Sequence, residues 1–229
     1  MNELELYVHI PFCVRKCAYC DFLSFPSKED LRQEYVNALI REIRGYGKRY
    51  ASCHVPTVFI GGGTPSILSS TQIQAVFSAI RETFRVDPEA EITMEANPGT
   101  VTEEKLLAWK GAGVNRISIG LQSVRDEELR MLGRIHDHRQ FLDTWRLVRQ
   151  AGMENVNIDL ISAIPGQTPE SWRETLRKTV ELAPEHLSVY SLIIEEGTPF
   201  YEWYSNGPRD PQSEDRGRGA KKDASQDAR

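Results

Sequence analysis

Short aliphatic segments alternate with amphipathic segments along most of the chain, and this alternation restricts the fold more than any other feature. The aliphatic segments are predicted strands, and they lie at residues 4–10, 55–60, 91–95, 115–119, 157–161 and 187–192. The amphipathic segments are predicted helices, and they lie at about residues 28–46, 71–84, 102–111, 126–132, 140–150 and 170–182. Strands that alternate with helices join through right-handed crossovers into a parallel sheet. Six units are fewer than the eight of a closed barrel, so we predict an incomplete, open (β/α)6 barrel and not a doubly wound sheet.

Two of the predicted helices carry a recognisable start. Ser27 and Asp30 have the spacing of a capping box, and Thr102 precedes an acidic first turn. A hydroxyl at the helix start accepts a hydrogen bond from a backbone N–H that the helix itself leaves free. We therefore expect Ser27 and Thr102 to cap their helices.

Polar and small residues recur at or near the ends of the predicted strands. These residues are Cys13, Gly61, Glu95, Gln122 and Asp159. In a barrel of parallel strands, the chemistry lies at the C-terminal ends of the strands. The sequence therefore predicts one shared site at that end of the sheet.

Three cysteines lie within eight residues, at Cys13, Cys17 and Cys20. Thiolates are soft ligands that suit iron–sulfur clusters and zinc. Structural zinc takes four protein ligands, commonly in separated C-x2-C pairs. The candidates for a fourth ligand here are His9, Cys53 and His54. None of them forms a familiar pair with the three cysteines, so a cluster that leaves one iron open is favoured over zinc.

Composition excludes several classes of protein. The net charge of −5 argues against non-specific binding to nucleic acid, which needs a basic surface. No apolar run approaches the ~18 residues of a membrane span. The first ten residues, MNELELYVHI, lack the basic start of a secretory signal, so we expect a cytoplasmic protein. Residues 205–229 are rich in charge and poor in aliphatic side chains, which predicts a disordered tail after a core at 1–204.

Several motifs, in order along residues 4–204, resemble those of radical S-adenosylmethionine (SAM) proteins. The closest resemblance is to the branch that contains oxygen-independent coproporphyrinogen III oxidase and the related haem chaperones. The motifs are YVHIPFCVRKCAYC at 7–20, GGGTPS at 61–66, MEANPG at 94–99, RISIGLQS at 116–123, NIDLISAIPGQTPESW at 157–172 and LSVYSLIIEEGTPFY at 187–201.

The resemblance implies two cofactors. A [4Fe–4S] cluster would be held by Cys13, Cys17 and Cys20, and the amino and carboxylate groups of SAM would chelate its fourth iron. The reduced cluster would cleave SAM to methionine and a 5′-deoxyadenosyl radical, and the protein would orient the cofactors and exclude water. The resemblance implies no catalytic side chain beyond the residues that bind the cofactors.

The resemblance also implies which residues contact SAM. Gly62, Gly63 and Thr64 would meet its aminoacyl end, Glu95 its ammonium and Arg134 its carboxylate. Gln122 and Asp159 would meet the ribose, Ile193 the adenine, and Tyr7 and Tyr19 would border SAM and the cluster. Plainer alternatives stay open: a glycine turn, a solvated carboxylate for Glu95, and packing for the two tyrosines. Asp159 lies within an apolar run, where a carboxylate without a partner or a purpose is rare. His136 and His138 lie in a polar segment and are expected to be solvated.

Two departures from the family pattern bear on function. Coproporphyrinogen oxidases typically carry a further cysteine two residues after the third, whereas this chain has Phe22, as in the haem-chaperone branch. Family members also continue beyond position 204, so a truncated or frame-shifted reading frame is a hypothesis. The sequence favours a chaperone that binds haem and transfers it to respiratory proteins. The alternatives are an oxygen-independent coproporphyrinogen III oxidase that acts on a porphyrinogen, and a non-catalytic zinc-binding module.

Overall fold

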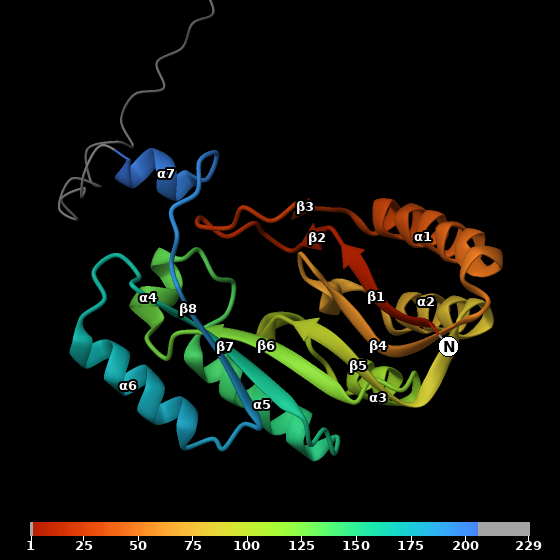
Figure 1. Ribbon diagram of the computed structural model, residues 1–229. Helices are drawn as coiled ribbons and strands as arrows, with labels where there is room; N and C mark the ends of the chain where they lie inside the picture. Colours follow the sequence, from red (N-terminus) through yellow and green to blue (C-terminus); the bar gives the residue numbers. More distant parts are fainter. Residues whose placement is uncertain (1, 206–229) are drawn as a thin grey trace, which may run out of the picture.

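Six parallel strands form a curved, open sheet, which confirms the predicted half-barrel (Figure 1). The computed structural model describes residues 2–205. The strands are β1 (Asn2–Ile10), β4 (Cys53–Gly62), β5 (Arg85–Ala96), β6 (Arg116–Gln122), β7 (Val156–Ser162) and β8 (His186–Ser191). They lie in the sheet in their order along the chain, and every neighbouring pair is parallel. The C-terminal ends of all six strands therefore meet at one rim of the sheet.

The predicted helices connect these strands and lie along the outer side of the curve (Figure 1). They are α1 (Glu29–Tyr50), α2 (Ser70–Thr83), α3 (Glu103–Gly111), α4 (Asp126–Met131), α5 (His138–Gln150) and α6 (Pro169–Val180). Short 3₁₀ turns follow β4 at Pro65–Ile67 and β5 at Pro98–Thr100. Each predicted strand and helix is present, with bounds that differ by a few residues.

Local capping explains where most helices begin. The Thr102 side chain accepts a hydrogen bond from the Lys105 N–H at 3.3 Å, as predicted. The prediction for Ser27 is wrong: α1 begins at Glu29 after Lys28, which makes no side-chain cap, and Ser27 Oγ has no hydrogen-bond partner. Acidic residues in the first turn, including Asp30, instead stabilise the start of the helix, because their negative charge interacts favourably with the positive end of the helix dipole.

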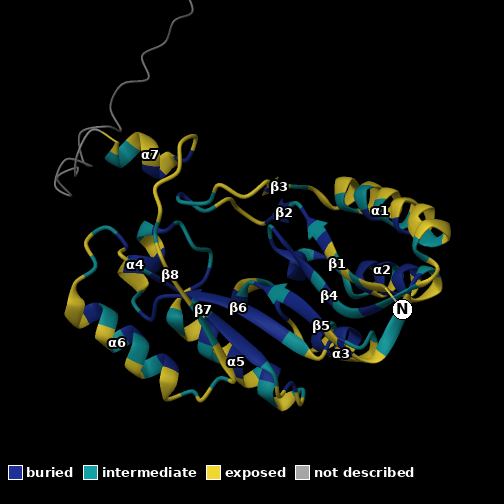
Figure 2. Cartoon of the chain, in the orientation of Figure 1, coloured by how far each residue is buried: buried dark blue, intermediate teal, exposed yellow. Residues whose placement is uncertain are grey.

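The core lies between the sheet and the outer helices. Ile60, Met94, Ile117 and Ile158 of four successive strands are fully buried there. Trp109 of α3 is also fully buried in this core. Complete burial of an isoleucine or methionine side chain stabilises the fold by about 1.5–3 kcal/mol. Figure 2 shows the buried residues along the central strands, whereas β8 at the C-terminal edge is largely exposed.

A short helix that was not predicted closes the described part of the chain. This helix, α7 (Pro199–Tyr204), buries Phe200 in a second apolar cluster with Ala18, Leu132, Ile161 and Ile164. The Phe200 N–H donates to the Ala18 carbonyl at 3.1 Å. The C-terminal segment thereby packs against the loop that carries the cysteines.

The predicted tail at 205–229 lies outside the described residues, apart from Ser205, which follows α7. Within residues 2–205, no helix has both the length and the apolar character that crossing a bilayer requires.

Candidate functional site

The cysteine-bearing loop runs between two very short strands, β2 (Phe12–Cys13) and β3 (Phe25–Pro26), which pair with each other. Cys13 is buried at the end of β2, and all three cysteines are free thiols. Arg15 Nη2 donates to the carbonyls of Gly133 and Arg134, at 2.8 and 2.9 Å. The Ala18 N–H donates to the Leu132 carbonyl at 3.0 Å. Contacts from distant parts of the chain therefore fix this loop.

A cavity of about 560 Å³ opens at the C-terminal rim of the sheet, as predicted from the strand-end residues. It collects most of the residues singled out in the sequence, and these are Cys13, Cys17, Tyr19, Cys20, Gly62, Gly63, Thr64, Glu95, Gln122, Arg134, Asp159 and Ile193. Gly61 does not line the cavity, and neither does Tyr7. Its ring stacks on Phe59, and its hydroxyl hydrogen-bonds His9 Nδ1 at 3.2 Å.

Three glycines at the C-terminal end of β4 let the backbone approach the cysteine loop, and the first two of them, Gly61 and Gly62, are the last residues of the strand. A Cβ on Gly63 would lie 2.7 Å from the Phe12 carbonyl oxygen, and Gly62 has a φ of 114°, which favours glycine. The Thr64 N–H donates to the same Phe12 carbonyl at 2.7 Å, and Thr64 Oγ1 donates to Cys13 Sγ at 3.5 Å. The end of β4 is thereby joined to the first thiol.

Glu95 lies beside this glycine segment, at the end of β5. Its Oε2 accepts a hydrogen bond from the Gly62 N–H at 3.0 Å. Burial raises the pKa of Glu95 to about 7, and the charge of Asp159 adds to the rise, whereas the Gly62 hydrogen bond opposes it. A cationic group placed in the cavity would favour the ionised carboxylate, so the site has the chemistry to take an ammonium.

Asp159 faces the cavity from β7 and is supported by neutral donors. Ser118 Oγ donates to it at 3.1 Å and Asn157 Nδ2 at 2.7 Å. Burial raises the pKa of the Asp159 carboxyl, and these hydrogen bonds together with one from Ser188 oppose the rise. A carboxylate held in this way can accept hydrogen bonds from ligand hydroxyls.

Arg134 links the cysteine loop to the end of β6. Its Nη2 donates to the Gly120 carbonyl at 2.8 Å, and its Nη1 lies 3.7 Å from Cys17 Sγ. The Nε atom is buried and has no hydrogen-bond partner. A guanidinium with an uncommitted donor at the cavity wall can pair with a carboxylate or another anion.

Gln122 ends β6 in an unusual backbone conformation. Its φ is 72°, and the pairing with β7 shifts register between Gly120 and Gln122. The side chain is buried, and its Oε1 accepts a hydrogen bond from the Tyr190 hydroxyl at 3.4 Å. Left-handed backbone at a residue other than glycine costs about 1–3 kcal/mol and is typical of ligand sites.

Sequence reasoning missed several polar residues of the site, namely Ser118, Ser188, Tyr190, Ser191 and Glu195. Some of them could have been found from strand register, because Ser188 lies directly across from Asp159 in the β7–β8 ladder. The prediction that His136 is solvated is wrong. Its side chain is buried, its ring Nε2 lies 3.3 Å from the Leu121 carbonyl oxygen, and burial lowers its pKa to about 3.

The donor set fits a cluster better than a zinc ion. Among residues 2–205, no three histidine, cysteine or acidic side chains are grouped to hold a single metal ion. A cluster has several irons, so each thiol can bind a different one. Cys53 and His54 begin β4 and pair with the first residues of β1, at the end of the sheet opposite to the cysteine loop. Neither can supply a fourth zinc ligand to that loop.

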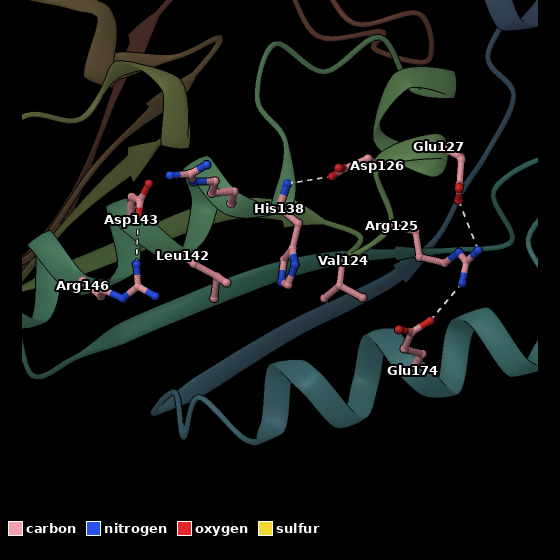
Figure 3. Close-up of a pocket in the computed structure, with 10 residues that line it drawn as sticks. Val124, Arg125, Asp126, Glu127, His138, Leu142, Asp143, Arg146 and Glu174 are labelled. Carbon is pink, nitrogen blue, oxygen red and sulfur yellow. Dashed lines mark hydrogen bonds and ion pairs between the residues drawn. The ribbon is translucent and has the colours of Figure 1, made fainter.

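A second hollow, of about 700 Å³, lies on the outer side of the sheet between α4, α5 and α6 (Figure 3). Its charged side chains largely satisfy one another. Arg125 pairs with Glu127 and Glu174, at 3.2 and 2.9 Å, and Arg146 pairs with Asp143. The cavity at the strand ends has the uncommitted donors and the thiols, and it is the candidate site.

Comparison with known proteins agrees with this geometry. The family model described as Radical SAM superfamily matches residues 7–179. The chain is 43% identical over 201 residues to the protein named heme chaperone HemW of Escherichia coli, covering 87% of this chain and 53% of that protein. It is 37% identical over 202 residues to the HemW of Bacillus subtilis, covering 88% and 53%. The chain thus spans about half the length of the curated relatives that it matches.

Solved structures give the same result for the fold. The structure titled coproporphyrinogen III oxidase (HemN) from Escherichia coli superposes with a TM-score of 0.83 at 32% identity, covering 92% of this chain and 49% of that one. Methylornithine synthase superposes with a TM-score of 0.60 at 16% identity, which is a likeness of fold alone. Because the family match covers most of the chain and the fold agrees, this chain belongs to the radical SAM superfamily.

Proposed function

We propose that this protein is a cytoplasmic haem chaperone of the radical SAM type, which binds a [4Fe–4S] cluster and SAM and transfers haem to respiratory proteins. The similarity to proteins named heme chaperone HemW supports haem as the cargo. Phe22 supports the chaperone over the oxidase, because it takes the position of the oxidases' further cysteine. Phe22 and Ile193 are each 67% exposed at the cavity, and an apolar rim suits a flat macrocycle.

One observation carries the proposal. Three free thiols line the same cavity as Glu95, which can bind a cation, and Arg134, which can bind an anion. Cys13, Cys17 and Cys20 would hold the cluster. A cluster bound by three thiolates supplies a redox-active metal with one coordination position left for a small molecule. The protein's own part is to bind and orient that molecule.

Each side chain around the cavity has a role in this proposal. Glu95 would accept the ammonium of SAM, and Arg134 would pair with its carboxylate through the uncommitted Nε donor. Gln122 and Asp159 would bind the ribose hydroxyls. Gly62, Gly63 and Thr64 would line the aminoacyl end, Ile193 would contact the adenine, and Tyr19 would border the cluster. Tyr7 would border the SAM site as a neighbour of Glu95. Burial raises the pKa of Tyr7, and the charge of Glu95 adds to that rise.

A test of the metal site is anaerobic reconstitution with iron and sulfide, followed by measurement of bound iron, sulfide and zinc. We expect about four irons per chain in the wild type, as for one [4Fe–4S] cluster. Cys17→Ala should lose most of that iron. Cys53→Ala is the matched control, because Cys53 lies at the opposite end of the sheet, and it should retain the iron. Zinc without iron or sulfide would overturn the proposal.

A test of the nucleoside site is the Kd for SAM of the reconstituted protein. Asp159→Asn should weaken SAM binding at least tenfold, which is about 1.4 kcal/mol, while the bound iron is unchanged. Glu127→Gln, on the outer side of the sheet, should leave the Kd unchanged. Equal SAM affinity in the Asp159 variant and the wild type would contradict the role given to Asp159.

Oxidation of a porphyrinogen is a second candidate function, favoured by the close superposition on coproporphyrinogen III oxidase. The two functions differ in product. A chaperone should give a haem-bound spectrum and no protoporphyrinogen, whereas the oxidase should convert coproporphyrinogen III with SAM and a reductant. Robust turnover would defeat the chaperone assignment.

A further inference from the structure

Glu128 of α4 is a buried carboxyl group with no role in the ligand contacts proposed above. Its side chain is only 7% exposed, and within the described residues it forms no ion pair with lysine or arginine. It accepts three hydrogen bonds instead, from Ser123 Oγ at 2.6 Å, Ser171 Oγ at 2.7 Å and Gln167 Nε2 at 3.0 Å. A buried carboxyl group held only by side-chain donors is costly unless all of them are in place.

The three donors come from segments that leave the rim of the cavity. Ser123 directly follows Gln122 at the end of β6, and Gln167 lies in the loop after β7. Ser171 is in the first turn of α6, where it also completes a capping box with Thr168. Glu128 thus ties the exit of β6 to the exit of β7, behind the wall formed by Gln122 and Asp159.

Ser123 is the direct link between Glu128 and the cavity. Its hydroxyl donates to Glu128 and accepts a hydrogen bond from the Arg125 N–H at 3.0 Å. The residue is fully buried. The preceding residue, Gln122, has a φ of 72°, a conformation that persists only where the surroundings hold it.

We propose that Glu128 is a positioning residue, which accepts the Ser123 hydroxyl and so keeps Gln122 in the backbone conformation that brings its side chain to the cavity. This inference rests on the proposed function, in which Gln122 binds a ribose hydroxyl. Glu128 itself touches no ligand and acts through Ser123.

The test compares two substitutions of similar size. Glu128→Leu removes the acceptor without leaving a cavity, and we expect the Kd for SAM to rise about tenfold, which corresponds to 1.4 kcal/mol. Glu128→Gln keeps an acceptor for Ser123 and Gln167. Its amide can donate to Ser171 Oγ, whose own proton then goes to the Thr168 carbonyl at 3.1 Å. We therefore expect Glu128→Gln to restore most of the affinity. Glu127→Leu, at an exposed neighbouring position, is the matched control and should keep the wild-type Kd.

A second readout separates positioning from general stability. In Glu128→Leu, amide hydrogen exchange should be faster in the peptide 118–125 than in the wild type, while exchange in β4 and the bound iron stay unchanged. Ser123→Ala should reproduce both effects, and the double variant Glu128→Leu/Ser123→Ala should be no worse than either single variant. If Glu128→Leu does not fold, Ser123→Ala decides the question alone.

Two results would overturn the proposal: wild-type exchange and affinity in Glu128→Leu or in Ser123→Ala, or a Glu128→Gln variant as defective as Glu128→Leu. Failure of the wild type to bind SAM would refute the proposed function instead. In that case the exchange of peptide 118–125, measured without SAM, still decides whether Glu128 holds Gln122.

Discussion

The two sides of the cavity are built in different ways. On the β4 side, backbone lies against backbone: Gly63 leaves no room for a side chain beside Phe12, and Gly62 donates to Glu95. On the β6–β8 side, side chains hold one another: Ser118 and Asn157 support Asp159, and Glu128 supports Ser123. The first side should therefore be sensitive to added atoms, and the second to lost donors and acceptors.

Two buried titratable groups, one on each side, respond to pH in opposite directions. His136 lies under β6 and stays neutral in the folded protein, because burial and then the charge of Arg134 lower its pKa. Glu95 lies beside the glycines, where burial raises its pKa. Acidification should thus lower the stability of the fold through His136 and raise it through Glu95.

The largest expected effect belongs to His136. The unfolded chain binds a proton near pH 6.5, whereas the folded chain binds it at His136 only near pH 3. Stability should fall as the pH drops through this window, by about 4 kcal/mol between pH 7.5 and 3.5. His136→Gln, whose amide reaches the position of the ring Nε2 and can donate to the Leu121 carbonyl, should lose about that much less stability on acidification when urea unfolding is followed at both pH values. An unchanged pH dependence would contradict the neutral buried imidazole.

Glu95 should produce the next largest effect, with the opposite sign. Its folded pKa of about 7 exceeds the unfolded value of 4.5, so the folded state binds the proton more tightly. Stability should fall as the pH rises from 4.5 to 7.5, by about 3 kcal/mol from this residue. Glu95→Gln should abolish that loss in urea titrations of the protein without added iron. Glu91→Gln, on the same strand and half exposed, should keep it.

A methyl group added on the β4 side should lower the free energy of unfolding by nearly as much as the Glu95 effect. In Gly63→Ala the new Cβ would meet the Phe12 carbonyl at 2.7 Å, and backbone atoms cannot turn away as a flexible side chain can. We expect a loss of about 1–3 kcal/mol in the free energy of unfolding. Gly45→Ala, inside α1 with nothing within 4 Å, should instead raise stability by about 0.5–1 kcal/mol. Equal stability of the two variants would contradict the claim that the β4 side of the cavity is sensitive to added atoms.

The smallest expected effect is a gain on the β6 side. Gln122→Gly should relieve the left-handed strain and stabilise the fold by about 1 kcal/mol in thermal or urea unfolding. The same variant should weaken SAM binding, because the amide is gone. A loss of stability would show that contacts of the Gln122 side chain outweigh its strained backbone.

The fold could be predicted from the sequence because its elements are encoded locally. Most strands contain a short aliphatic run, and most of the long helices have a polar and an apolar face. The helix α7 could not be found in this way, because Phe200 is buried by residues far away in the chain, such as Ile161. The same reason explains His136, which sits in a polar segment that happens to pack beneath β6.

The site residues that belong to sequence motifs could be predicted. The residues that reach the site only through the register of the strands could not. Cys13, Glu95 and Asp159 belong to motifs that can be recognised along the chain. Ser118 and Ser188 enter the cavity because the strands of the sheet align them with Asn157 and Asp159. Tyr7 lies on the same face of the sheet as Glu95, but it comes earlier along its strand and contacts His9 and Phe59 instead of lining the cavity.

The exposed position of β8 has a practical consequence. Among residues 2–205, β1 and β8 are the two strands of the six-stranded sheet with a neighbour on one side only. β1 carries Glu3 and Glu5, and like charges of this kind discourage another chain from extending a sheet, but β8 (HLSVYS) has no acidic or lysine guard. Within residues 2–205, the main-chain amides at the open edge of β8 are therefore where we expect this segment to aggregate, and a lysine introduced on that strand should reduce the aggregation.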